Sequence, residues 1–457
     1  MRNWLPDLHT RALLNRQLRR TWQLSPPAIL AGSFLFLIVA GALLLWLPWA
    51  SPADYPVSFW AALFTACSAV TVTGLTIIDV GHLTLFGQVV VLLLIHLGGL
   101  GLMTFAALTV VALGGRLGLR GQSLVREAVN QTSPGDVLTL VRYMVILAFS
   151  VEAVGVLLLA LVWVPEMGFW RGLWFSLFHV VSAFNNAGFG LLPDNLAPWV
   201  SQPVVNLVIT ALIIIGGLGF TVLIDLWRQR RFSRLSLHSK LTLTGTAILL
   251  LGAWLLIMLF EWNNARTLGS LSEGARPLAA WFTAVTPRTA GFSTLDIGGL
   301  TSPTVLLMMF LMFIGGGSGS TASGIKVSTF MVVLIATRAF LKGDSQPMLF
   351  RRTVAMVTVF RAYTVVILSI TLVAIACFVM VILEPKISPL DLMFEVFSAF
   401  GTAGLTRGIT TSLSTAGQGV LMVLMFAGRI GPLALAFSLA RQRHSKVRYT
   451  EDRVLVG

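Results

Sequence analysis

Residues 59–75 read FWAALFTACSAVTVTGL, an apolar run that ends in a polar pentad with glycine at its fourth place. Three further pentads of this kind follow apolar runs, at 185–189, 288–292 and 401–405. A single glycine of this sort is typical of an ordinary tight turn. Four copies with the glycine at the same place indicate instead one structural unit that is repeated along the chain.

The composition predicts that these units lie in a membrane. Of the 457 residues, 56% are hydrophobic and 11% are charged, whereas soluble proteins average about 45–50% and about 25%. So few charges cannot cover a water-exposed surface, and they also exclude a disordered chain. The net charge is +14, but no basic run is interleaved with aromatic residues, so nucleic acid is excluded as a partner.

Eight stretches are long and apolar enough to cross a bilayer, which takes about 20 residues. Between successive pairs lie four shorter apolar stretches, at 57–70, 170–184, 277–287 and 388–400. These are too short to cross, and we interpret them as re-entrant pore helices. The eight predicted spans are 27–49, 85–113, 142–164, 204–227, 240–262, 304–336, 361–384 and 417–440.

Most of the 32 Lys and Arg residues fall in five segments beside or between the pairs of spans. The positive-inside rule assigns all five segments to the cytoplasm. Both termini are then cytoplasmic, and each short stretch enters from outside and returns. The five segments are 1–25, 114–142, 228–240, 338–361 and 441–457.

The predicted fold is an all-α integral membrane protein of eight transmembrane helices and four re-entrant pore helices. They form four pseudo-symmetric M1-P-M2 repeats, each a helix, a pore helix and a second helix, around one central pore. We expect the repeats at 26–113, 142–227, 240–336 and 361–440, between a cytoplasmic N-terminal segment, 1–25, and a cytoplasmic tail, 441–457.

The four pentads are the predicted ion filter. A ring of such loops offers carbonyl oxygens that replace the hydration shell of an ion, and glycine leaves no side chain in the pore. The predicted ion-binding residues are Thr71, Val72, Thr73, Gly74, Asn185, Asn186, Ala187, Gly188, Arg288, Thr289, Ala290, Gly291, Gly401, Thr402, Ala403 and Gly404.

Residues 315–324, GGGSGSTASG, interrupt the span at 304–336. They cannot form a firm helix, because each glycine costs about 1 kcal/mol relative to alanine. Interrupted membrane helices mark ion pathways, so we interpret the segment as a gating loop below the filter, with a passive kink as the alternative. The candidate gate residues are Gly315, Gly316, Gly317, Ser318, Gly319, Ser320, Lys326 and Arg429.

Arg429 lies where the second helices of the other units carry Gly99, Gly217 and Gly316. An arginine inside a membrane is costly and indicates a function; below a cation filter, its charge would raise the barrier to permeation. The alternative is a buried structural ion pair, for which Glu152 is the candidate partner. The glycines at 98–101 and 216–219 favour close helix packing.

The four pentads and the run at 315–326 resemble the Trk/Ktr/HKT superfamily of potassium transporters, over about residues 26–440. The short N-terminal segment is similar to that of its KtrB-type membrane subunits. The resemblance implies that potassium passes a filter built on four glycines and that residues 315–324 form the gate with Arg429. It also implies that glycine in the first pentad favours potassium, where sodium-preferring relatives carry serine. The four glycines are Gly74, Gly188, Gly291 and Gly404.

The resemblance further implies a homodimer in a bacterial plasma (inner) membrane. Its cytoplasmic face would dock a KtrA-like ring of nucleotide-binding RCK subunits, so this chain itself is expected to bind no organic cofactor. Potassium is the expected ion, and sodium is left open as an activator. Passive, sodium-stimulated and proton-linked transport all remain open.

Two alternative functions were weighed against gated potassium uptake. One is a less selective or sodium-coupled monovalent cation transporter. The other is a membrane-embedded enzyme or an assembly scaffold. The sequence contains no His-Glu-x-x-His motif, P-loop or nucleophile elbow, which are signatures of enzymatic sites. An enzyme would also leave the four glycine pentads unexplained, so we expect a transporter and no enzymatic activity.

Overall fold

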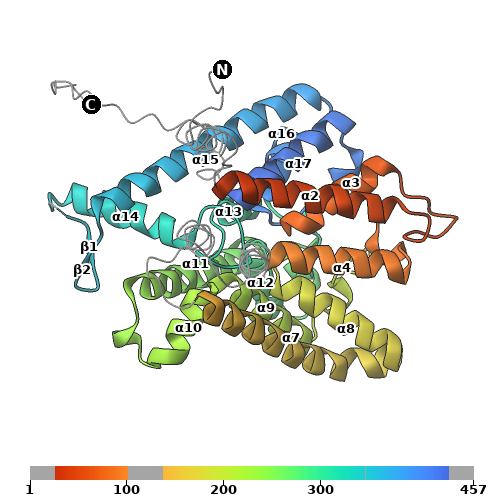
Figure 1. The fold of residues 1–457 in the computed structure, drawn as a ribbon, viewed down its shortest axis with the longest axis horizontal. Coiled ribbons are helices and arrows are strands. Elements are labelled where there is room, and N and C mark those ends of the chain that lie inside the picture. The colour runs from red at the N-terminus through yellow and green to blue at the C-terminus, as the bar shows by residue number, and fades with distance from the viewer. Residues whose placement is uncertain (1–25, 101–136, 345, 432–457) are drawn as a thin grey trace, which may run out of the picture.

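The computed structural model describes residues 26–100, 137–344 and 346–431. This part of the chain is almost entirely helical (Figure 1), apart from a hairpin of β1 (Met348–Leu349) and β2 (Arg352–Thr353). The helices are α2 (Pro26–Trp46), α3 (Phe59–Thr71), α4 (Leu85–Gly99), α7 (Val137–Met167), α8 (Phe169–Phe184), α9 (Pro203–Leu218), α10 (Phe220–Gln229), α11 (Leu237–Glu261), α12 (Arg276–Val285), α13 (Ser302–Phe313), α14 (Val327–Leu341), α15 (Met356–Leu383), α16 (Pro389–Gly401) and α17 (Thr415–Ile430).

One order of elements occurs four times: a helix, a short helix, a pentad, a single 3-10 turn and a further helix. We call these sets the first to fourth groups, which begin with α2, α7, α11 and α15. The short helices α3, α8, α12 and α16 match the predicted short stretches to within two residues at each end, so the prediction of four short helices at these places is confirmed. The 3-10 turns after the pentads are η1 (Val80–His82), η2 (Ala197–Trp199), η5 (Ile297–Gly299) and η6 (Thr410–Ser412), and two more are η3 (Phe232–Arg234) and η4 (Leu268–Ser270).

The long helices differ in part from the eight predicted spans. Within the described residues, α11, α15 and residues 142–167 of α7 are each long and apolar enough to cross a membrane. α9 and α10 are bent by 95° at Gly219, whose φ of +96° suits glycine, so the span at 204–227 is not straight. The span at 304–336 is split into α13 and α14. The predicted spans at 85–113 and 417–440 extend beyond the described residues. The predicted segments at 1–25 and 441–457, and most of the loop at 114–142, lie outside the described residues.

The four groups close into a ring. α4 contacts α8, α9 contacts α12, α13 contacts α16, and α17 contacts α3. The last helix of each group therefore packs on the short helix of the next, and the fourth group returns to the first. Figure 1 shows this closure, with α17 in blue beside α3 in orange-red. The largest buried cluster includes Phe64 of the first group and Phe400 of the fourth.

Indole groups on three short helices hydrogen bond across the ring contacts. Trp60 Nε1 donates to Gln418 Oε1 at 2.7 Å, and Trp174 Nε1 donates to Gln88 Oε1 at 2.7 Å. These two bonds occupy equivalent places in two neighbouring pairs of groups. At a third contact Trp281 donates to Thr210 Oγ1 at 3.2 Å. Methionine and phenylalanine side chains fill the fourth contact, between α13 and α16.

Large apolar side chains cover the outside of the ring. Phe36 of α2, Leu161 of α7, Leu259 of α11 and Phe378 of α15 are each more than 70% exposed. Soluble proteins rarely expose contiguous apolar surface on this scale, whereas a lipid-facing surface requires it. The chain is a mostly helical, multi-pass membrane protein.

The substitution Trp60→Phe should lower stability by about 1–2 kcal/mol, because it leaves the buried acceptor Gln418 without its donor. The midpoint of thermal unfolding in detergent measures this effect. Trp170→Phe is the control, because Trp170 is 81% exposed on α8 and should not change the midpoint. Equal midpoints for the two variants would contradict a role for the indole bond in closing the ring.

Candidate ion-conduction site

The four pentads leave their short helices with the same backbone conformation. The second residue of each is left-handed: φ is +57° at Val72, +58° at Asn186, +66° at Thr289 and +49° at Thr402. Two residues later the glycine again has positive φ, between +71° and +94°, which glycine adopts at no steric cost. The pentads are therefore structural equivalents, as their sequence pattern predicts.

The four glycines form a closed ring of main-chain contacts. Each one packs on the carbonyl oxygen of the third residue in the neighbouring pentad, so closely that a Cβ added to it would lie under 3.0 Å from that oxygen. Real Cβ atoms essentially never approach so near, so no other residue fits without a shift. The pairs are Gly74 on Ala187 (2.4 Å), Gly188 on Ala290 (2.7 Å), Gly291 on Ala403 (2.8 Å) and Gly404 on Thr73 (2.2 Å).

Hydrogen bonds fasten each pentad to its own short helix. In the first, second and fourth groups the third pentad residue donates its main-chain N–H to the carbonyl of a serine six residues before the glycine, at 2.7–2.8 Å. The three serines are Ser68, Ser182 and Ser398. In the third group Ala290 N donates instead to Thr286 O at 3.0 Å. We did not single out these serines from the sequence, although an alignment of the four units would have revealed them.

The predicted interruption of the third group is present. Residues 314–326 are not helical, and a bridge between Ile314 and Ile325 closes them into a loop. The loop is bonded to the second group: Gly317 N donates to Gly217 O at 2.7 Å, and Thr321 Oγ1 donates to Phe184 O at 3.2 Å. Phe184 ends α8, directly before the second pentad, so the loop lies against the end of that short helix.

Arg429 binds this loop, and the suggested ion pair with Glu152 is wrong. Its Nη1 donates to Thr321 O and, at 3.1 Å, to Ser323 Oγ, and its Nη2 donates to Gly98 O at 2.6 Å. Main-chain carbonyls therefore take the place of a carboxylate. Glu152 lies elsewhere, behind the second pentad, where it accepts a hydrogen bond from Asn185 Nδ2 at 3.3 Å.

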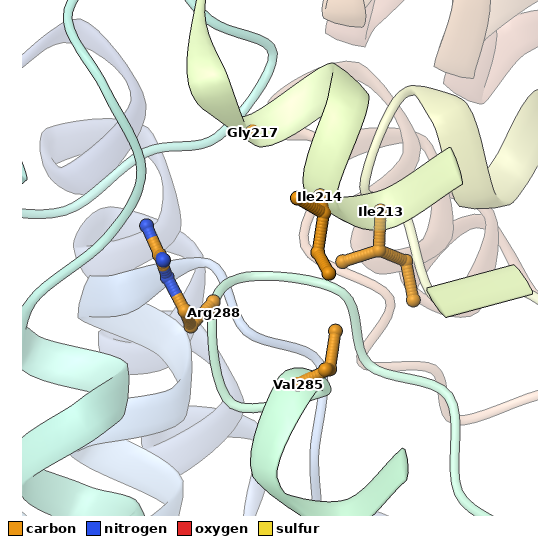
Figure 2. Close-up of a pocket in the computed structure, with 5 residues that line it drawn as sticks. All are labelled: Ile213, Ile214, Gly217, Val285 and Arg288. Carbon is orange, nitrogen blue, oxygen red and sulfur yellow. The ribbon is translucent and has the colours of Figure 1, made fainter. Parts of the chain in front are cut away.

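Two more cations donate to the same loop. Lys326 Nζ donates to Ala322 O at 2.6 Å, and Arg288 Nη2 donates to Gly315 O at 3.4 Å. Figure 2 shows Arg288 at one side of a small pocket, with Ile213 and Ile214 of α9 at the other. The four ion pairs found among the described residues include none of the three cations. The side chain of Arg288, predicted as a filter residue, thus contacts the loop.

Gly98 and Gly216 pack against the short helices α3 and α8, which agrees with the close helix packing predicted for the glycines in these two stretches. A Cβ added to Gly98 or Gly216 would lie 2.0 Å from the carbonyl oxygen of Val70 or Phe184. Each of these carbonyls belongs to the residue four places before the pentad glycine. Gly428 makes the equivalent approach to Phe400 O, at 1.9 Å. Small residues therefore bring the last helix of three groups onto the end of its own short helix.

The family model of the cation transport protein TrkH matches residues 26–447. The chain belongs to the TrkH family. It is 47% identical to the Ktr system potassium uptake protein B of Bacillus subtilis, over 95% of this chain and 97% of that protein. It is 44% identical to the protein of the same name from Vibrio alginolyticus, over 94% of this chain and 95% of that one.

Two further TrkH-family relatives extend the comparison. The potassium/sodium uptake protein NtpJ of Enterococcus hirae is 38% identical, over 97% of this chain and all of that protein. The crystal structure of the potassium transporter TrkH from Vibrio parahaemolyticus matches with a TM-score of 0.71 at 18% identity, covering 90% of this chain and 84% of that one. The chain therefore has a TrkH-like fold. As a member of this family it is a transport protein and not an enzyme.

The substitution Gly404→Ala should destabilise the protein more than Gly408→Ala, by about 1–3 kcal/mol, the usual cost of overpacking. Both glycines have positive φ, so backbone strain is common to both variants. Only at Gly404 would the new methyl group meet a neighbour, since nothing lies within 4 Å at Gly408. Thermal unfolding of both purified variants measures the difference. Equal losses would mean that the ring contacts are looser than the structure indicates.

Proposed function

We propose that this chain takes up potassium across a bacterial plasma membrane, through one pore lined by the four pentads and gated by residues 315–324. The observation that carries the proposal is the closed ring in which each filter glycine packs on a carbonyl of the next pentad. Two relatives at 47% and 44% identity over nearly the whole chain are named potassium uptake proteins, which supports potassium as the ion.

In this proposal the four groups are pseudo-symmetric repeats, at 26–113, 142–227, 240–336 and 361–440, and their short helices are re-entrant. Carbonyl oxygens of the pentads replace the hydration shell of the ion, and the absent glycine side chains leave its path open. The basic segments 228–240 and 338–361 are in contact, since the ring centroids of Phe232 and Phe350 are 5.9 Å apart. Their contact supports one cytoplasmic face.

The proposed gate is the loop of the third group. It is held shut by hydrogen bonds from Arg429 and by Gly317 N on Gly217 O. Arg429 also adds a fixed positive charge next to the ion path, which raises the barrier for a cation. Opening breaks these bonds and withdraws the loop, and its glycines allow the required backbone change. Lys326 stabilises the loop through Ala322.

We further propose that the protein works as a homodimer whose cytoplasmic face binds a KtrA-like ring of nucleotide-binding RCK subunits. The name of the relatives, Ktr system protein B, supports a system with further components. Sodium is left open as an activator. A second candidate function is less selective transport of potassium and sodium, favoured by the potassium/sodium uptake protein of Enterococcus hirae at 38% identity.

The proposal is tested by rescue of a bacterial host that lacks its own potassium uptake systems. The full chain, co-expressed with an RCK partner, should restore growth at sub-millimolar potassium. Gly74→Ser should lower the potassium-to-sodium uptake ratio about tenfold, which corresponds to about 1.4 kcal/mol of discrimination. An unchanged ratio in folded protein would argue against the filter. Failure of the wild-type chain to rescue, with partner and protein present in the membrane, would redirect the assignment to another cation.

Arg429→Ala should raise the rate of potassium uptake several-fold, because it removes both the buried charge and the bonds that hold the loop. Arg429→Lys keeps the charge but loses the planar, forked donor, so its uptake should fall between those of wild type and Arg429→Ala. Uptake is measured per folded protein in the same host. A lower rate in folded Arg429→Ala would mean that the arginine is a scaffold and not part of a gate.

A further inference from the structure

A buried carboxylate stands behind the fourth pentad. Glu395 lies on α16, nine residues before Gly404, and its exposure is 0%. The equivalent residues of the other short helices are Thr65, His179 and Phe282, so only the fourth group has an acid at this place. An acid buried inside a membrane protein costs free energy and therefore indicates a function. The hydrogen bonds of Glu395 indicate which function.

Both oxygens of Glu395 accept hydrogen bonds from the segment that follows the fourth pentad, residues 406–410, which we call its exit strand although it is not part of a sheet. Thr406 Oγ1 donates to Oε1, and Thr410 Oγ1 lies 3.0 Å from Oε2. Thr406 Oγ1 also accepts the main-chain N–H of Gly408 at 2.9 Å. The carboxylate therefore ties the pore helix that enters the fourth pentad to the strand that follows it.

This tie fixes the second end of the fourth pentad. Its first end is already held by Ala403 N on Ser398 O, at 2.8 Å. Ala403, at the first anchor, and Gly404, between the two anchors, make two of the four ring contacts: Gly404 packs on Thr73, and Gly291 packs on Ala403. A shift of this strand would therefore change the ring on two of its sides.

After the third and the first pentads, neutral hydroxyl groups donate to main-chain carbonyls. Thr286 Oγ1 donates to Phe292 O after the third pentad, and Thr76 Oγ1 donates to Ile78 O at 2.6 Å after the first. The segment after the fourth pentad is tied to α16 by two carboxyl groups, because Arg407 Nε also donates to Asp391 Oδ1.

We propose that Glu395 is a positioning residue for the fourth filter strand and that it sets the discrimination between potassium and sodium. Through Thr406 and Thr410 it holds the carbonyl of Ala403 at the spacing that suits potassium. A looser strand would let these oxygens close around the smaller sodium ion. This inference rests on the proposed filter function of the pentads.

The test measures potassium and sodium uptake per folded protein for the full chain with its RCK partner. Glu395→Gln keeps the shape but has one acceptor oxygen, so it should lower the potassium-to-sodium ratio several-fold, and Glu395→Ala should lower it about tenfold or more. Thr406→Val removes the partner hydroxyl and should also lower the ratio. The double variant Glu395→Gln with Thr406→Val should be no worse than the more affected single variant, because both changes remove one interaction.

Glu384→Gln is the matched control. Glu384 is a buried carboxylate of the same group that accepts Ser414 N at 2.7 Å, at the start of α17, away from the pentad. It should change stability but not the ratio. An unchanged ratio in folded Glu395→Gln and Thr406→Val would overturn the positioning role, even if Glu395→Ala fails to fold.

Gly74→Ser, assayed in parallel, distinguishes the proposed role of Glu395 from the proposed filter function of the pentads. If Gly74→Ser lowers the ratio while the Glu395 and Thr406 variants do not, the filter stands and the role of Glu395 is wrong. If none of these variants changes the ratio, the filter itself is wrong. A fall in Gly74→Ser and in the Glu395 and Thr406 variants, with Glu384→Gln unchanged, supports both.

Discussion

Four segments of main chain meet so closely that none of them can carry a side chain at the point of contact. This constraint requires glycine at four places, and it requires each glycine to present positive φ while a neighbouring carbonyl lies against it. The surrounding helices support the same contact. In three groups, glycines let the last helix pack closely on the short helix, and hydrogen bonds from indole groups join adjacent groups. Apolar surface is left for the outside, where lipid can cover it.

Positive charge inside this assembly is balanced by main-chain oxygen. Arg288, Lys326 and Arg429 all donate to carbonyls of residues 314–326, a segment whose carbonyls are not used in a helix because it is not helical. The interruption of the helix in the third group therefore provides the acceptors that allow these three cations to be buried. A regular helix there would use its carbonyls internally and remove these acceptors from the three cations, at a large desolvation cost. Arg429 would keep only the carbonyls of Gly98 and Gly99.

The sequence was sufficient for features that depend on local composition. The short helices follow from apolar runs too short to cross a membrane, and the break at 315–324 follows from five glycines in ten residues. The acceptors of Arg429 could not be predicted, because main-chain carbonyls have no residue-type signature. Glu152, the acid suggested as its partner, instead accepts a hydrogen bond from Asn185. The bonds of Trp60 and Glu395 were also missed, since they depend on circular closure and on the path of a strand after its pentad.

The contact between α17 and α3 is a seam that joins residues more than 300 positions apart. The chain is made from its N-terminus, and contacts of long sequence separation form late. Gly74 therefore cannot pack on the carbonyl of Ala187 until the second group is made. Thr73 cannot contact Gly404 until nearly the whole protein has been synthesised. The ring of glycine contacts can therefore close only when the fourth group has been made.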